Sequence, residues 1–235
     1  PSLFNSLKFS NNLTSVLGDI RDKEKFKIAF EQCNPEFVFH MAAQPLVLKS
    51  YKNPEETFDI NFKGTLNLLE ILKEFNQKVQ AVFITTDKVY ENLELGVPFV
   101  ETDNLGGKDP YSASKAASEI LINSYSQSFF RDSNISIATA RAGNVIGGGD
   151  WSDNRLIPDI IKAAQDNSPL IIRNLKAIRP WQHVLEPLFG YLMLGVGLFN
   201  NPNKYIGSWN FGPDNDDVKS VEDIINIGKK LEVVG

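Results

Sequence analysis

The sequence predicts an α/β protein with a doubly wound parallel sheet and a smaller, mixed lobe. Short apolar runs rich in β-branched and aromatic residues alternate with stretches of helical spacing, which is typical of parallel strands covered by helices on both faces. Polar or glycine-rich residues follow the main apolar runs. Because ligands bind beyond the carboxyl ends of the strands in such sheets, these residues are the first candidates for a site.

The first part of the chain supplies two predicted strands and a helix between them. Residues 37–43 (FVFHMAA) and 79–86 (VQAVFITT) are continuous apolar runs, and residues 55–75 show helical periodicity. The apolar positions of this helix are Phe58, Phe62, Leu66, Leu69 and Leu72.

A second helix and a third strand follow, over residues 111–130 and 135–143 (ISIATARAG). The apolar face of the helix is predicted to consist of Ala113, Ala117, Ile120, Leu121 and Tyr125. After this strand the composition changes to Gly, Pro, Trp and Arg, which indicates a second and more irregular lobe. We therefore expect a core of residues 1–145 and a lobe of residues 146–235, with residues 208–213 returning to the core sheet as a strand.

Composition limits the class of function. Hydrophobic residues make up 42% and charged residues 23% of the chain, values typical of a soluble globular protein. The net charge of -5 argues against nucleic acid or an anionic membrane as the main partner. Cys33 is the one cysteine, which excludes an intramolecular disulfide, and we expect it to fill the core at the end of a helix. The sequence shows no signal-peptide pattern and no apolar run long enough to span a bilayer, so we expect a cytoplasmic protein.

Tyr111 and Lys115 lie four residues apart at the start of the second predicted helix, after a possible cap, Asp109, and Pro110. This spacing puts both side chains on one helix face, opposite the apolar one. A tyrosine base needs a neighbouring cation that favours the phenolate, and Lys115 can supply that charge. The alternative is that both side chains belong to a solvated helix face.

Thr86, Asp87 and Lys88 follow a predicted buried strand directly. Thr86 can hydrogen-bond a substrate oxygen, and Asp87 can donate a proton if its surroundings raise its pKa. The alternative is a turn that ends the strand, which these three residue types also suit.

The later part of the chain holds several weaker candidates. The segment GNVIGGGDW lacks the spacing of a dinucleotide fingerprint, and its glycines fit either a ligand contact or a plain loop. Arg155, Arg173 and Arg179 suit bidentate binding of a diphosphate, although each alone fits a surface cation. His183 has no second ligand at metal-binding spacing, and His40 fits a hydrogen-bonded core residue, so no metal is expected.

Five motifs follow one another along the chain: GDIRD (18–22), HMAAQP (40–45), TTDK (85–88), YSASK (111–115) and RAGNVIGGGDW (141–151). Together they resemble the extended short-chain dehydrogenase/reductase family, and NRLIPDII, IIRN, IRPWQHVLEPL and WNFGP extend the resemblance almost to the end of the chain. The resemblance implies a Rossmann-type core that binds NAD and a lobe that binds a nucleotide-sugar.

The resemblance also implies roles for individual residues. Tyr111 would be the base at the sugar 4-hydroxyl, with Lys115 holding the nicotinamide ribose and Asp87 acting as the acid that helps water to leave from C6. Thr86 and Lys88 would complete the catalytic group, Lys88 in a role that the resemblance leaves open between a base, a positioning group for Asp87 and a polarising group. The expected cofactor-binding residues are Asp19, Ile20, Ala42, Ala43, Gln44, Asn61, Thr85, Tyr111 and Lys115. The expected substrate-binding residues are Asn144, Arg155, Leu156, Arg173, Arg179 and Asn210.

Within the family, the sequence is similar to the 4,6-dehydratases that act on CDP-glucose. Those enzymes oxidise C4 with NAD, lose water across C5 and C6, and return hydride to C6, which gives a 4-keto-6-deoxy sugar for deoxysugar and lipopolysaccharide biosynthesis. Relatives that act on dTDP-glucose have Glu where Lys88 stands, and 4-epimerases lack the acidic pair. A dTDP-glucose dehydratase, a 4-epimerase and a non-catalytic nucleotide-binding scaffold remain the alternatives.

Two further expectations follow from the resemblance. The family begins with a strand and a Gly-rich turn that this sequence lacks, so the chain is expected to be a piece of a longer enzyme that binds NAD poorly alone. Relatives pair through the helices predicted at residues 55–75 and 111–130, which implies a homodimer or homotetramer.

Overall fold

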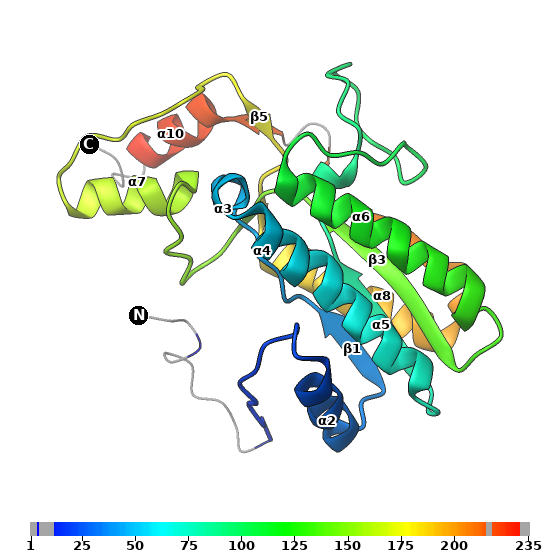
Figure 1. Ribbon diagram of the computed structural model, residues 1–235. Coiled ribbons are helices and arrows are strands. Elements are labelled where there is room, and N and C mark those ends of the chain that lie inside the picture. Colours follow the sequence, from blue (N-terminus) through cyan, green and yellow to red (C-terminus); the bar gives the residue numbers. More distant parts are fainter. Residues whose placement is uncertain (1–3, 5–11, 215–217, 231–235) are drawn as a thin grey trace. The chain divides into compact units, whose positions relative to one another are not determined.

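A computed structural model describes residue 4, residues 12–214 and residues 218–230 of the chain (Figure 1). The chain divides into two compact units. The sheet unit comprises Ser15–Ala142 and Leu188–Phe211, and the small unit comprises Pro1–Thr14, Gly143–Pro187 and Gly212–Gly235. The sequence suggested a boundary after residue 145 and a returning segment of residues 208–213, whereas the segment that rejoins the sheet unit begins at Leu188.

The sheet unit is built on four parallel strands in the order β1-β2-β3-β7. They span Phe37–His40, Val79–Ile84, Ile135–Ala142 and Gly207–Phe211. In the register, Phe37 lies opposite Gln80, and Ala140 lies opposite Trp209. The predicted parallel sheet is confirmed. The first two strands end earlier than predicted, so the residues that follow them belong to loops at the carboxyl edge.

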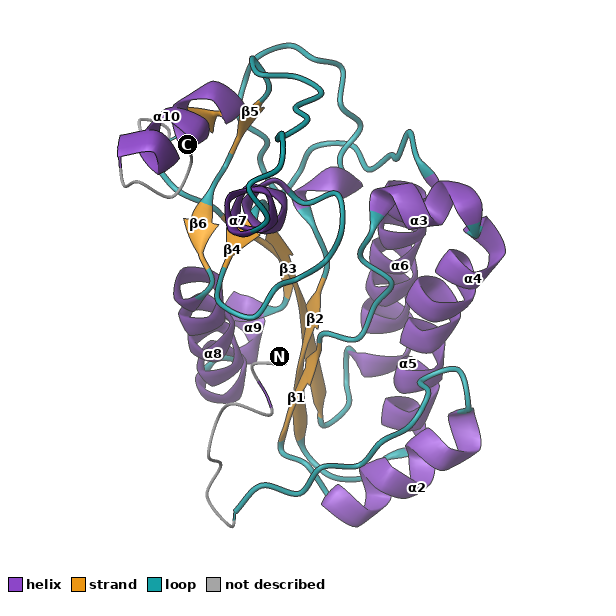
Figure 2. Ribbon diagram, turned by 90° about the vertical axis from the view of Figure 1, so that its left-hand side faces the viewer, coloured by secondary structure: helices purple, strands orange, loops and turns teal. Residues whose placement is uncertain are grey.

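Helices cover both faces of this sheet (Figure 2). The picture shows α5 (Gly64–Glu74) and α6 (Pro110–Tyr125) on one face and α8 (Leu185–Asn200) on the other. The remaining helical elements of the sheet unit are α2 (Lys23–Cys33), α3 (Val47–Lys52), α4 (Pro54–Phe58), the π-helical turns η1 (Asp59–Lys63) and η3 (Ser126–Phe130), the 3₁₀ turn η2 (Asp87–Val89) and α9 (Pro202–Tyr205). This arrangement is the doubly wound α/β fold that the sequence predicts.

The helix cap predicted before Tyr111 is present. The carboxylate of Asp109 accepts a hydrogen bond of 3.0 Å from the backbone N–H of Ser112, and Pro110 occupies the first helical turn. A Cβ atom at Gly107 would overlap the backbone of Ala113, so the loop before α6 closes tightly on the same turn. These local contacts fix where the helix begins.

The predicted apolar face of α6 is only partly correct, because Leu121 and Tyr125 do pack against the core but Ile120 does not. Ile120 is 61% exposed, whereas the buried residues of the helix include Ser114, Lys115, Ser118 and Glu119. Small hydroxyl and charged side chains can be buried where each polar atom has a partner, and hydrophobic periodicity does not detect that case. The helix predicted at residues 55–75 departs in the same way at its start, because Phe58 is exposed.

The main hydrophobic core lies between the sheet and the helices of one face. Its largest fully buried side chains come from α5 and β2 and include Leu68, Leu69, Leu72 and Phe83. Cys33 lies at the end of α2 as expected, but it is exposed, so its predicted place in the core is wrong.

The small unit contains two short strand pairs and two helices. Strand β4 (Val145–Ile146) pairs in parallel with β6 (Gln182–His183), and β5 (Ile178–Arg179) pairs antiparallel with β8 (Lys219–Ser220). The helices are α7 (Leu156–Gln165) and α10 (Val221–Lys230). In neither unit does a described helix have the length and apolar character needed to cross a membrane.

Candidate active site

The candidate residues of the sheet unit gather around the carboxyl ends of β1 and β2 and the start of α6. Tyr111 and Lys115 are 8% and 6% exposed, so the alternative of a solvated helix face is wrong. The backbone N–H of Tyr111 donates a hydrogen bond of 3.1 Å to the hydroxyl of Ser50 on α3. A lysine and a tyrosine are thus buried one helical turn apart, as a tyrosine base with a cationic neighbour requires.

The ammonium group of Lys115 is held against the end of β2. Its Nζ atom donates a hydrogen bond of 3.1 Å to the carbonyl oxygen of Ile84. Burial lowers the pKa of Lys115 to about 8, and the nearby charge of Glu119 partly opposes this shift. Because one carbonyl is its acceptor among the described residues, the ammonium group keeps donor capacity for a ligand oxygen.

Thr86, Asp87 and Lys88 form the turn directly after β2. The Thr86 hydroxyl donates a hydrogen bond of 3.1 Å to Asp87 and accepts one of 3.4 Å from the backbone N–H of Lys88. Thr86 is buried, Asp87 is half-buried and Lys88 is exposed. The residues therefore do cap a strand-terminating turn, and they also present a carboxylate at the sheet edge.

Asn61 connects the loop after β1 to α6. Its side-chain oxygen accepts a hydrogen bond of 2.8 Å from the backbone N–H of Gln44, and its amide donates to the carbonyl of Gln44 at 3.1 Å and to Ser114 Oγ at 2.9 Å. The π-helical turn also leaves the carbonyl of Asn61 as an acceptor for the hydroxyls of Thr65 and Ser118. The predicted supporting role of Asn61 therefore has a definite geometry.

The other residues expected near a cofactor differ in exposure. Asp19 is exposed and pairs with Arg21 at 2.6 Å, and this hydrogen bond lowers the pKa of Asp19 to about 2. Ile20 is half-buried and packs so closely on Gly64 that a Cβ atom there would overlap it. Ala42 is exposed and Ala43 is half-buried, so this stretch after β1 is accessible to solvent.

His40 lies at the end of β1 and is a buried, hydrogen-bonded residue, as predicted. Its Nε2 atom lies 3.3 Å from the hydroxyl oxygen of Thr65. Because the Thr65 hydroxyl donates its hydrogen bond to the carbonyl of Asn61, Nε2 is the donor to Thr65. Burial, and then the charge of Lys115, lowers the pKa of His40 to about 3. The ring is therefore neutral.

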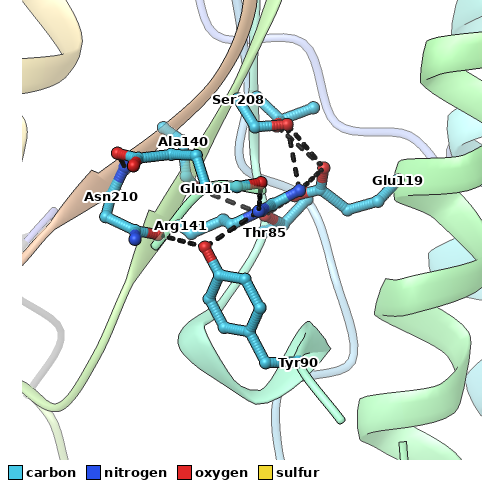
Figure 3. Close-up of polar contacts among 9 residues, drawn as sticks. Thr85, Tyr90, Glu101, Glu119, Ala140, Arg141, Ser208 and Asn210 are labelled. Atoms are coloured by element: carbon cyan, nitrogen blue, oxygen red, sulfur yellow. Dashed lines mark hydrogen bonds and ion pairs between the residues drawn. The ribbon is translucent and has the colours of Figure 1, made fainter. Parts of the chain in front are cut away.

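Thr85 belongs to a buried polar cluster beneath the site (Figure 3). Its hydroxyl donates a hydrogen bond of 2.5 Å to Glu119, which forms an ion pair with Arg141 at 3.0 Å. The sequence motifs did not assign a function to Glu119 or Arg141. A signal was present, because an arginine inside the apolar run of residues 135–143 needs a buried partner of opposite charge.

Asn210, expected to bind substrate, is already hydrogen-bonded within the sheet unit (Figure 3). Its side-chain oxygen accepts a hydrogen bond of 2.6 Å from the hydroxyl of Tyr90, and its amide donates to the carbonyl of Phe99 at 3.2 Å. Its backbone N–H donates to Glu101 at 2.8 Å. These contacts tie β7 to the loop that leads from Asp87 to Tyr111.

The other substrate candidates lie in the small unit. Arg155 pairs with Asp150 at 3.3 Å, and Arg173 donates to the carbonyl of Asn154 at 3.5 Å, so these two arginines lie near one loop. Arg179 is exposed on β5 and donates to the carbonyl of Ile178.

Three residues complete the candidates of this unit. The carbonyl of Asn144 accepts a hydrogen bond from Gln182, and Leu156 begins α7. His183 is exposed and accepts a hydrogen bond from the backbone N–H of Leu185, which fits its structural interpretation.

Comparison with known proteins identifies relatives along most of the chain. A family profile described as GDP-mannose 4,6 dehydratase matches residues 3–194. The chain is 46% identical over 231 residues to the CDP-glucose 4,6-dehydratase of Salmonella typhimurium, a match that covers 96% of this chain and 64% of that protein.

Solved structures with the same fold include two epimerases. An epimerase of Methanothermobacter thermautotrophicus has a TM-score of 0.83 at 26% identity, and the match covers 96% of this chain and 65% of that one. A UDP-glucose 4-epimerase of Thermus thermophilus in complex with NAD has a TM-score of 0.75 at 26% identity, covering 90% of this chain and 67% of that one. The chain spans less than two thirds of the Salmonella relative. The resemblance that the motifs indicated is confirmed.

Proposed function

Because the chain belongs to the family of GDP-mannose 4,6-dehydratases, we propose that the protein is an NAD-dependent 4,6-dehydratase of a nucleotide-linked sugar, with CDP-glucose as its substrate. The observation that carries the reaction type is the burial of Tyr111 and Lys115 on one helix beside the turn that holds Asp87. The choice of CDP-glucose is supported by the 46% identity to the Salmonella enzyme of that name. The product would be a CDP-linked 4-keto-6-deoxyglucose.

The residues described in the sheet unit fit NAD. The ammonium group of Lys115 has further donors for ribose hydroxyls, and the exposed stretch at Ala42 and Ala43 is assigned to the pyrophosphate. Asp19 and Ile20 are assigned to the adenine. The loop after β1 is held in place by buried hydrogen bonds between the backbone of Gln44 and the side chain of Asn61. NAD supplies the redox chemistry at C4 and C6 when it is bound.

The chain's own residues would handle the protons. Tyr111 is assigned as the base that takes the proton of the 4-hydroxyl group, and the cation of Lys115 stabilises its phenolate. The resulting 4-keto group makes the proton at C5 acidic. Asp87 is assigned as the acid that protonates the hydroxyl leaving from C6, with Thr86 orienting its carboxylate at 3.1 Å. Loss of water across C5 and C6 also needs an acceptor for the C5 proton: Lys88, exposed beside Asp87, is assigned either as that base or as the group that polarises the 4-keto oxygen, in which case a water molecule accepts the proton.

Substrate recognition is assigned to the small unit. The guanidinium groups of Arg155, Arg173 and Arg179 are suited to a diphosphate, and Asn144 and Leu156 to the rest of the nucleotide. For Asn210, the hydrogen bonds to Tyr90 and Phe99 support a positioning role over direct contact with substrate. Thr85 is likewise assigned a supporting role, because its hydroxyl donates a hydrogen bond to Glu119.

We further propose that the protein forms a homodimer or homotetramer in the cytoplasm. The outer faces of α4, α6 and the turn after α6 expose apolar side chains, with Phe58, Ile120 and Phe129 exposed by 38%, 61% and 49%. Exposed apolar side chains on these elements support an interface between copies.

A mass-spectrometric assay tests the proposed reaction. The whole natural protein and this 235-residue chain are incubated with NAD and either CDP-glucose, dTDP-glucose or UDP-glucose. We expect the whole natural protein to remove one water molecule from CDP-glucose. Tyr111→Phe should lower kcat by about 10²-fold or more, while the matched change Tyr125→Phe on the same helix leaves it unaltered.

The other outcomes separate the alternatives. Dehydration of dTDP-glucose in preference to CDP-glucose would contradict the substrate, and an isomer of unchanged mass would indicate a 4-epimerase. A folded whole protein that converts none of these sugars would favour the nucleotide-binding scaffold.

A further inference from the structure

The carboxylate of Glu119 is buried in the sheet unit and receives hydrogen bonds from side chains on neighbouring strands (Figure 3). The hydroxyl of Thr85, which directly follows β2, donates to Oε1 at 2.5 Å. The hydroxyls of Thr139 on β3 and Ser208 on β7 donate to Oε2 at 2.8 and 3.4 Å. One side chain of α6 is therefore joined to three adjacent strands.

Arg141 compensates the charge of this carboxylate. Its Nε and Nη2 atoms each lie 3.0 Å from one oxygen of Glu119, in a bidentate pair whose side chains are 4% and 2% exposed. The guanidinium group also donates to the hydroxyls of Tyr90 and Ser208 and to the carbonyl of Glu101. Apolar residues of similar volume often replace such a buried pair without loss of stability, so stability alone is a weak reason for its presence.

The pair is placed where it can set the geometry of the candidate active site. Glu119 lies one helical turn after Lys115 and two turns after Tyr111, on the same face of α6. Lys115 binds the carbonyl of Ile84, and Glu119 binds the hydroxyl of the next residue, Thr85. Two successive turns of the helix are thus attached to two successive residues at the strand end, just before Thr86 and Asp87.

We propose that Glu119 is a positioning residue of the reaction: through Thr85 and Arg141 it fixes the height and rotation of α6 on the sheet. It thereby sets where Tyr111 and Lys115 lie relative to Asp87. The kinetic part of this inference rests on the function proposed above, whereas the surroundings of Lys115 can be measured without it.

Electrostatics provides that independent measurement. Glu119 is the charged group that opposes the burial-driven lowering of the pKa of Lys115. The other titratable groups to consider are His40 on β1, whose own pKa Lys115 lowers, Tyr111 at the helix start, and Asp87 on the 3₁₀ turn packed against α6. Loss of the Glu119 charge should move the titration of the Lys115 ammonium group to lower pH, which tests the interaction between these two residues independently of catalysis.

The test uses the whole natural protein and three variants. Glu119→Gln removes the charge at constant length, and the double variant Glu119→Met with Arg141→Met replaces the pair by apolar volume. Tyr125→Phe is the matched control. It removes a different side-chain hydrogen bond of α6, the one that the Tyr125 hydroxyl donates to Glu70 at 2.6 Å, at a site away from Lys115. For each protein, kcat and KM for CDP-glucose are measured, and Lys115 is titrated by ¹⁵N NMR of its Nζ, assigned with Lys115→Arg.

We expect Glu119→Gln to lower kcat on the order of 10²-fold, with KM within about threefold of the unaltered protein. The titration of Lys115 should move to lower pH. The double variant should fold and also lose kcat, and the control should match the unaltered protein in both measurements.

Several results would overturn the proposal. A folded Glu119 variant with unaltered kcat, or one with raised KM and unaltered kcat, would exclude a positioning role. Failure of both Glu119 variants to fold would assign the pair to folding instead. If the unaltered protein dehydrates no sugar, the proposed function fails and the kinetic role of Glu119 with it. The Lys115 titration, which must move in Glu119→Gln and stay in place in Tyr125→Phe, then still tests the interaction of Glu119 with Lys115.

Discussion

The side-chain amide of Asn61 donates a hydrogen bond of 2.9 Å to the hydroxyl oxygen of Ser114, and this bond joins the π-helical turn to the helix that carries Tyr111 and Lys115. Asn61 is 1% exposed, and its other side-chain bonds go to the backbone of Gln44. One amide group therefore sets the spacing between the loop after β1 and α6.

Asn61→Ala should be strongly destabilising. The substitution leaves the buried N–H and carbonyl of Gln44 without their partner, and each buried polar group left unpaired costs about 1–3 kcal/mol. We expect the free energy of unfolding in urea to fall by about 3 kcal/mol. Asn123→Ala, at an exposed position of α6, is the control and should stay within about 0.5 kcal/mol. Equal effects at the two positions would contradict the role of Asn61.

Lys115 should make the protein more stable at alkaline pH. Its pKa is lowered from 10.5 to about 8 by burial, so the unfolded chain binds more protons than the folded one between these values. Stability therefore rises as pH increases from about 8 to 10.5, by about 3 kcal/mol from this group. The measurement is the free energy of unfolding against pH, compared with Lys115→Met, in which this part of the rise should be missing. A parallel pH dependence in the two proteins would contradict the buried ammonium group.

His40 should contribute to unfolding in acid. Burial lowers its pKa from 6.5 to about 3, so the unfolded chain takes up the proton first as the pH falls. The folded state should lose stability from about pH 6.5 down to about pH 3. In His40→Gln, which keeps a donor for the Thr65 hydroxyl and does not titrate, the loss over this range should be smaller. An unchanged acid transition in that variant would show that other groups control it.

Leu69→Ala should test the core between α5 and the sheet. Leu69 is 0% exposed, and truncation of such a leucine typically costs about 2–5 kcal/mol. Leu95, which is 73% exposed, provides the matched control, and Leu95→Ala should change the free energy of unfolding by less than about 0.5 kcal/mol. Denaturant unfolding of the two variants side by side makes the comparison.

Hydrophobic runs predicted the strands correctly, because a parallel strand buried on both faces leaves a continuous apolar signature, as in residues 135–143. The same reasoning was only partly right for α6, where Leu121 and Tyr125 pack on the core but Ile120 is exposed. Its buried face contains Ser114, Ser118 and Glu119, which satisfy their polar atoms with Asn61, Thr85 and the sheet. Periodicity scores those residues as surface, since the partners that make burial possible come from distant parts of the chain.

The candidate site was predictable to a similar extent. Asp87 follows from a motif at a strand end, because parallel strands bring their carboxyl ends to one edge, and Tyr111 and Lys115 follow from their spacing of four residues on a helix. The exposure of Lys88 and the internal bonds of Asn210 depend on side-chain directions that no spacing rule gives. Cys33 shows the same limit, because its position at a helix end was correct and its burial was not.

The carboxylate of Glu119 also constrains how the protein can change in evolution. It accepts from Thr85, Thr139, Arg141 and Ser208 at once, so aspartate would be too short for these donors and glutamine would bring hydrogens against the guanidinium group. A single substitution at position 119 is therefore disfavoured unless position 141 changes with it. Across homologous sequences the two positions should vary jointly, and the hydroxyl residues at 85, 139 and 208 should be lost where the charged pair is lost.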